Sequence, residues 1–424
     1  MPTLRLLLLS YVALLPLRRL EFLPLLEHLG PIFHLTEVVF LLLAPLALWH
    51  AGRELRPPAN AFTLGTLFLL IVLTLSTLRA GHPHGYFELL GRYYLLAVFL
   101  IFYWATRHFG PPFLREVYRY WTYGAAALVY LAYLGYPLAF LLDWEGLVWL
   151  YQDYPYFGTV YRASATAGGS NALILLVFLP FFYDYWRWRR EGRRPFFALI
   201  CLPLFVLTLS KEVLLVPTTC LLMEWAFTRR RWWHYAMALG FYAIYNFSTH
   251  YLVQPPTDIT GTIFTRAEYS PGKVAYRDDH LQLLETSYVA LKRTALWQAA
   301  RHPLIGLGAD QFQQTLQDDR PLGVYPAHLP PYAPHCTWTG ILAESGLLGF
   351  CALLLMVAGL VSKLRDNLRA GPTPAKPYNQ CLLAYWILLG LSSINNDLLH
   401  LQYVWVPLAL VLGQVGSKWS RSEV

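Results

Sequence analysis

Residues 334–349 read PHCTWTGILAESGLLG, and they lead directly into an apolar run. Upstream, residues 302–308 read HPLIGLG, and the whole segment from 251 to 334 is largely hydrophilic. His335 therefore stands where a long polar segment meets an apolar helix. This pattern predicts a membrane helix that carries a histidine at its mouth and follows a large loop outside the membrane.

The composition argues against an ordinary soluble domain. Of 424 residues, 56% are hydrophobic and only 14% are charged, and the mean hydropathy is +0.39. A typical soluble domain has about 25% charged residues. The chain is therefore predicted to be an all-α polytopic membrane protein.

Apolar runs predict about twelve transmembrane helices, because about 20 helical residues cross a hydrocarbon core of roughly 30 Å. No small-residue cleavage site follows the first run, so we interpret it as a retained helix rather than a removed signal peptide. The seventh and eighth runs are short. The predicted ranges are 3–17, 31–50, 60–78, 86–106, 117–141, 169–186, 195–210, 211–228, 232–250, 335–361, 379–394 and 399–416.

Basic residues gather in alternate connections, as expected of cytoplasmic segments under the positive-inside rule. Examples are Arg187 to Arg194, Arg229 to Arg231 and Lys363 to Lys376. Both termini are then predicted to be cytoplasmic. The net charge of +8 mainly reflects this bias, and we expect no nucleic-acid partner.

This topology divides the chain into three parts. Residues 1–250 hold helices 1 to 9, residues 251–334 form a large, partly helical loop domain on the outer side, and residues 335–424 hold helices 10 to 12. The cytoplasmic connections are short and contain no Gly-rich phosphate-binding element. Any chemistry is therefore expected on the outer face, where nucleotide donors are absent.

Cations on the outer side are the first site candidates. Lys211 lies at the tip of a short hairpin, where an ammonium is costly unless it faces water or an anion; the alternative is a side chain that extends to the interface. Arg162 precedes a stretch of small residues leading into the sixth helix. It could hold an anion together with that helix N-terminus, or be an ordinary loop arginine.

Further candidates lie in or near the helices. His335 could accept a proton from a hydroxyl at a wet interface, or simply be amphipathic. Arg92 lies four residues after Glu88, so the two could neutralise each other within one helix. Arg266 is a secondary candidate in the outer loop. Glu344 is predicted to be buried, on the helix face opposite His335.

The sequence offers little for metals or disulfides. The five cysteines form no CxxC motif and no pair in the outer loop, so neither a zinc site nor a disulfide framework is indicated. The acidic pairs Asp278-Asp279 and Asp318-Asp319 are each isolated in the sequence. We expect neither a metal nor a cofactor.

These motifs together resemble the O-antigen ligase and O-antigen polymerase superfamily of bacterial membrane glycosyltransferases. The resemblance covers the helix count, the large outer loop between the ninth and tenth helices, and a hairpin that reads Thr208-Leu209-Ser210-Lys211. The matching motif positions are Arg293, Trp297, His302, Pro303, Leu304, Gly306, Gly308 and Phe312, followed by Pro334, His335, Glu344, Gly346 and Gly349.

The resemblance implies a GT-C-type fold in the bacterial inner membrane, with the active site facing the periplasm. It implies metal-free, inverting transfer of a glycan from undecaprenyl pyrophosphate to a hydroxyl on a glycan or lipid A core. Arg162, Lys211 and Arg293 would bind the pyrophosphate, and His335 would activate or orient the acceptor. Two positions depart from the family: Lys211 replaces an arginine, and Cys336 replaces an asparagine.

Two alternatives remain open. A polymerase would use another lipid-linked repeat unit as the acceptor. A transporter could line an ion path with Arg92, Lys211 and Glu344, although the sequence shows no inverted repeat of the kind many transporters contain.

Overall fold

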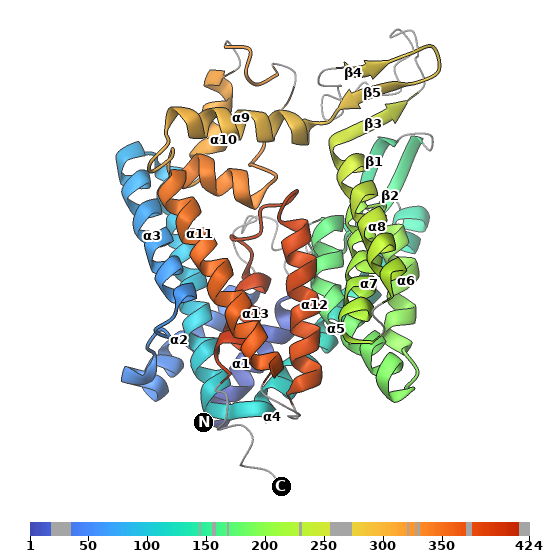
Figure 1. Ribbon diagram of the computed structural model, residues 1–424. Helices are drawn as coiled ribbons and strands as arrows, with labels where there is room; N and C mark the ends of the chain where they lie inside the picture. Colours follow the sequence, from blue (N-terminus) through green and yellow to red (C-terminus); the bar gives the residue numbers. More distant parts are fainter. Residues whose placement is uncertain are drawn as a thin grey trace.

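The computed structural model describes residues 1–17, 35–142, 144, 146–154, 158–167, 169–228, 231–254, 274–319, 322–326, 329, 331–369 and 375–414. This part of the chain is mostly helical (Figure 1). Three of its helices are long and apolar enough to cross a membrane. Large apolar side chains, including Leu41, Ile71 and Phe140, stay exposed on the helices, which agrees with association with a membrane.

The first part of the described chain is helical. Its helices are α1 (Pro2–Leu14), α2 (Leu35–Ala51) with the short η2 (Gly52–Glu54), α3 (Ala61–Ala80) and α4 (Pro83–Leu142). The predicted runs 86–106 and 117–141 both fall within α4, which is interrupted at Gly110. Gly110 has a φ of 69°, a conformation that glycine adopts without a steric penalty. Pro111 and Pro112 follow it and suit the first turn of a new helix.

The middle of the chain begins with a hairpin of β1 (Val148–Tyr154) and β2 (Gly158–Ala163). Next come α5 (Ser170–Glu191), α6 (Phe196–Leu207), η3 (Lys211–Leu214), α7 (Leu215–Phe227) and α8 (Trp232–His250). Helices α6 and α7 have 12 and 13 residues, or about 20 Å each at 1.5 Å per residue. Leu209, between α6 and η3, has a left-handed φ of 47°.

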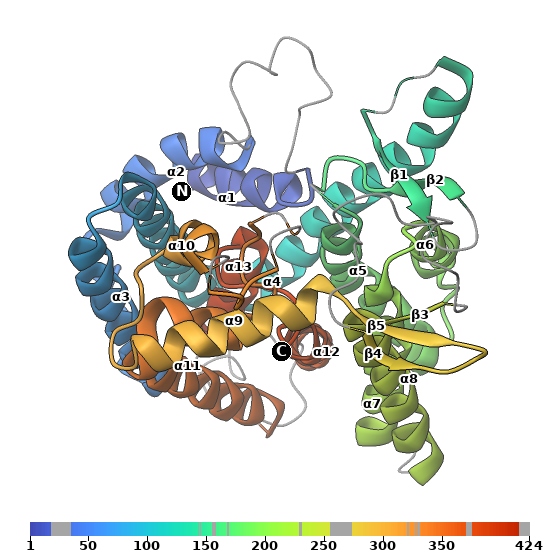
Figure 2. The ribbon, with the colours of Figure 1, turned by 90° about the horizontal axis from the view of Figure 1, so that it is seen from above.

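The segment predicted as an outer loop contains strands as well as helices. Strands β3 (Tyr251–Gln254), β4 (Val274–Arg277) and β5 (Gln282–Glu285) form an antiparallel sheet in the order β3-β5-β4. Helices α9 (Ser287–Arg301) and α10 (Gln311–Asp319) follow and lie across one end of the bundle (Figures 1 and 2). A small apolar core joins them: Ala290, Leu291, Ala295, Phe312, Leu316, Tyr325, Leu329 and Ala343.

The last helices are α11 (Thr337–Arg369), α12 (Lys376–Ser392) and α13 (Gln402–Leu412). Helix α11 packs along α3, where a Cβ on Gly65 would lie 2.6 Å from the Ala352 carbonyl oxygen. Gly346 interrupts α11 with a φ of 64° and a ψ of −164°. The sequence predicts one continuous helix over residues 335–361, but the structure interrupts the helix at this glycine.

The two sequence motifs meet at this break. Leu307 N and Gly308 N donate to the carbonyls of Ala343 and Glu344, each at 2.9 Å. In return, Leu347 N donates to Pro303 O at 2.7 Å, and Leu348 N donates to Leu304 O at 3.1 Å. We call residues 302–308 with 343–348 the interlock. The broken helix thus exchanges its own hydrogen bonds for bonds to the chain after α9.

Candidate functional site

A polar region lies beneath α9, at the end of the bundle that carries both small sheets (Figure 1). Four segments meet there: η3, the end of α8, the residues just before α11, and the connection from α12 to α13. Each of these segments adjoins an apolar helix. Polar side chains therefore concentrate where the helices end.

Tyr288 on α9 brings together two of the predicted site residues. Its ring lies 5.9 Å from Lys211 Nζ and its centroid lies 5.0 Å from that of His335. Tyr332 also lies close to this imidazole, with ring centroids 5.8 Å apart. Lys211 and His335 are more than a hundred positions apart in sequence, yet they share one aromatic partner.

His335 lies in the loop before α11, which begins at Thr337. The expectation that it lies in the same helix as Glu344, on the opposite face, is therefore wrong. Both residues instead lie within range of the charge of Asp397. Burial lowers the pKa of His335, and Asp397 partly offsets this effect. An imidazole that stays neutral near pH 7 can accept a proton.

Lys211 begins η3, directly after the chain reversal at Leu209. Burial lowers its pKa to about 8; Glu212 opposes that shift and Arg162 adds to it. The carboxylate of Glu212 is itself held by the hydroxyl of Ser210 and by Asn396 Nδ2 at 3.1 Å. Lys211 therefore extends toward Tyr288 with its neighbouring carboxylate already engaged.

Arg162 lies on β2 opposite Trp149. Its Nε donates to the carbonyl of Thr208 at 2.9 Å, which ties the hairpin to the end of α6. Its charge also reaches Lys211. The structure thus brings Arg162 close to Lys211.

A second lysine, Lys292, joins this region and was not predicted as a site residue. Its ammonium donates to His250 Nε2 and to Asn395 Oδ1, each at 2.7 Å. His250 Nδ1 lies 2.7 Å from the carbonyl of Asn246, and this contact leaves Nε2 to accept. Tyr288 and Lys292 are four residues apart, so they share one face of α9. That spacing is the sequence signal that could have identified Lys292.

Arg293 does not join Lys211 and His335. Its guanidinium is paired with Glu285 at 3.1 Å, and its side chain is 56% exposed. The adjacent residues Lys292 and Arg293 therefore point to different sides of α9. Arg266 lies outside the described residues.

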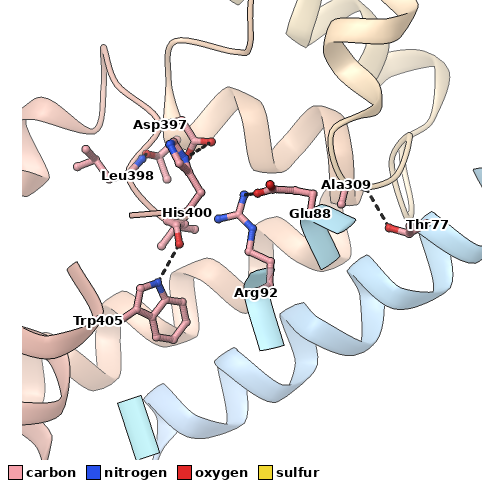
Figure 3. A network of polar contacts seen from close by, with 10 residues as sticks. Thr77, Glu88, Arg92, Ala309, Asp397, Leu398, His400 and Trp405 are labelled. Carbon is pink, nitrogen blue, oxygen red and sulfur yellow. Dashed lines mark hydrogen bonds and ion pairs between the residues drawn. The ribbon is translucent and has the colours of Figure 1, made fainter. Parts of the chain in front are cut away.

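Arg92 belongs to a neighbouring cluster, shown in Figure 3. Its Nη2 pairs with Glu88 Oε1 at 2.9 Å, and the guanidinium lies between Glu88 and the Asp397–His400 pair. Among the described residues, Nε and Nη1 of Arg92 have no hydrogen-bond partner. Glu344 is buried beside this cluster, within range of the charges of Arg92 and Asp397.

The connection from α12 to α13 links the two regions. Thr337 N donates to the carbonyls of Ser393 at 2.9 Å and Asn396 at 3.1 Å, and Leu398 N donates to Thr337 Oγ1 at 3.0 Å. These bonds fix Asp397 close to His335. The polar run from Ser392 to Asp397, between two apolar helices, is a second signal that the sequence prediction did not use.

The arrangement provides cations and, in His335, an imidazole that can stay neutral. The described residues contain no group of three or more His, Cys, Asp or Glu side chains placed to hold a metal ion. Positive charge can stabilise a developing anion, and the imidazole can take a proton from a hydroxyl. No family model matches this chain, and no curated protein matches it either.

Proposed function

We propose that the protein is a membrane glycosyltransferase of the O-antigen ligase type. It moves a glycan from undecaprenyl pyrophosphate to an acceptor hydroxyl on a glycan or lipid A core. The observation that carries this proposal is the approach of both Lys211 and His335 to one tyrosine, Tyr288, with Arg162 beside the lysine. A cation and a potential base next to each other suit transfer from an anionic leaving group to a hydroxyl.

Lys211, Arg162 and His335 are sufficient for this transfer reaction. As the bond between the sugar and the pyrophosphate breaks, negative charge grows on the leaving phosphate oxygen. Lys211 and Arg162 stabilise that charge, so no strong general acid is required. His335 accepts the proton of the attacking hydroxyl. Direct displacement by this hydroxyl inverts the anomeric centre.

The placement of charge supports a periplasmic site in a bacterial inner membrane. The candidate site lies near the start of α5 and the end of α8. Helix α5 has 22 residues, so it extends about 33 Å and carries Arg189 and Arg190 to the opposite end of the bundle. The positive-inside rule then assigns that end, which includes the start of α1, to the cytoplasm. We propose twelve spans in a GT-C-like arrangement with both termini cytoplasmic.

The test is glycan transfer in a host that lacks its own ligase. Wild type is compared with Lys211→Met and His335→Ala at matched membrane expression. Arg119→Met serves as the control, because Arg119 is an exposed arginine on α4 that bonds Tyr123. We expect wild type and Arg119→Met to cap the lipid A core, and the two site variants to lose transfer.

The product identifies the acceptor. Lengthened lipid-linked chains, instead of a capped lipid A core, would make this enzyme a polymerase. Normal transfer by both site variants would remove Lys211 and His335 from the mechanism. Absence of any transfer by wild type, with both donor and acceptor supplied to the purified protein, would contradict the proposed function.

A further inference from the structure

Lys211 and Lys292 stand out among the basic residues that the structure describes. Arginines elsewhere in the described chain, such as Arg5, Arg189 and Arg293, pair with carboxylates. Neither Lys211 nor Lys292 forms an ion pair with any described carboxylate. Both ammonium groups are partly buried, and burial lowers the pKa of each. A desolvated positive charge without a counterion favours binding of an anion.

The charges of Lys211 and Lys292 act on the same residue, His250. Both place their charge on the imidazole of His250 at the end of α8, although they come from different elements. Lys211 lies beside Tyr288, and Lys292 follows Tyr288 by one helical turn on the same face of α9. The two lysines therefore lie in one polar region, and Lys211 also shares Tyr288 with His335.

The contacts of Lys292 hold its ammonium without neutralising it. An ammonium has three N–H donors, and two of them go to His250 Nε2 and Asn395 Oδ1. Both acceptors are uncharged in this arrangement, so the full positive charge stays available. Among the described residues, the third donor has no hydrogen-bond partner. Lys292 is thus positioned by the protein and left with one donor for a ligand.

Arg293 differs from Lys292 in exposure and in its partner. Its guanidinium is more than half exposed and already paired with the carboxylate of Glu285. A ligand would have to displace that carboxylate or move α9 to use it.

We propose that Lys292, and not Arg293, is the cation of α9 that binds the diphosphate of the lipid-linked donor, together with Lys211. This inference rests on the proposed function for the identity of the donor. The ligand class is a prenyl diphosphate, and His250 and Asn395 are the positioning residues that direct Lys292. Lys211 and Lys292 hold the diphosphate from two sides, which leaves His335 for the acceptor.

The test measures binding, and it requires neither acceptor nor turnover. Full-length protein in detergent is titrated with farnesyl diphosphate, and with farnesol as the uncharged comparison. Lys292→Met should weaken binding of the diphosphate roughly 10- to 100-fold, the loss expected for one hydrogen bond from a charged donor. Binding of farnesol should not change. Arg293→Met is the matched control, and we expect its affinity for the diphosphate to stay within about twofold of wild type.

A second substitution separates charge from folding. Lys292→Arg keeps the charge and should retain most of the diphosphate affinity, while melting curves show whether each variant is folded. A folded Lys292→Met protein with wild-type affinity would overturn the inference, and so would a loss confined to Arg293→Met. Diphosphate binding that depends on Lys292 in a protein unable to transfer glycans would keep this inference and reject the proposed enzyme function.

Discussion

Replacement of Gly346 by alanine tests the interlock between the residues after α9 and the break in α11. Gly346 has a φ of 64°, and a Cβ there would lie 2.4 Å from both the carbonyl carbon and the oxygen of Leu304. These are backbone atoms, so they cannot rotate away as the end of a side chain could. Relief of the clash would disturb the bonds from Leu347 N to Pro303 O and from Leu348 N to Leu304 O.

The magnitude follows from two contributions. Gly346 combines its positive φ with a ψ of −164°, a region essentially restricted to glycine, and another residue there pays about 1–3 kcal/mol. Overpacking of a closely packed site costs about 1–3 kcal/mol more. We therefore expect Gly346→Ala to lower the free energy of unfolding by about 2–6 kcal/mol. The assay is denaturant unfolding of the purified protein in detergent.

Gly390 on α12 provides the matched control. It lies in a regular helix, and a Cβ there would meet nothing within 4 Å. Gly390→Ala should leave stability unchanged or raise it by up to about 1 kcal/mol, because alanine favours helix more than glycine does. Equal stability of the Gly346→Ala and Gly390→Ala proteins would refute the reasoning about the interlock.

Three further predictions follow from the site. The rate of glycan transfer should fall above pH 8 as Lys211 loses its proton, because burial lowers the pKa of Lys211 to about 8. The Lys211→Arg protein should not show this fall. If the rate of Lys211→Arg falls above pH 8 as it does in wild type, Lys211 is not the cause. The rate should also fall in acid, with a midpoint below the ordinary histidine pKa of 6.5, because burial lowers the pKa of His335. A midpoint above pH 6.5 would contradict the assignment of this fall to His335. Asp397→Asn should move the acid side of the pH–rate profile to still lower pH, because the charge of Asp397 raises the pKa of His335. An unchanged profile would mean that Asp397 does not act on the imidazole.

Helix positions could be predicted from the sequence better than helix boundaries. Each predicted apolar range contains all or part of a helix. By length and composition, however, only three of the described helices could cross a membrane. Hydropathy reports where apolar residues gather. It does not report breaks such as the one at Gly346, where the chain folds onto a segment forty residues away. The only sequence signal for this break is the glycine itself, which can adopt a positive φ without a steric penalty.

Only part of the candidate site could be predicted from the sequence, because the sequence does not show how a helix is rotated in the fold. Lys211 and His335 could be selected because each stands at an apolar boundary, where a charged or titratable group needs an explanation. Lys292 and Arg293 look equivalent in the sequence, since both are basic and adjacent. Only the rotation of α9 about its axis separates them, and that rotation depends on tertiary contacts. The resemblance to a known family selects Arg293, whereas the geometry selects Lys292.

The contacts at the two ends of α9 explain how this rotation is fixed. At its start, Thr286 N donates to the carbonyl of His250 at 2.9 Å, and the Thr286 hydroxyl donates to Thr249 O at 2.6 Å. At its end, the chain enters the interlock with α11, where Arg79 of α3 also bonds the carbonyl of Gly306. A helix turns about 100° per residue, so a slip of one position would exchange Lys292 for Arg293 on the inner face. Anchors at both ends prevent that slip. The glycines of the interlock therefore act on the site from a distance, because they help to determine which of two adjacent cations faces His250 and Asn395.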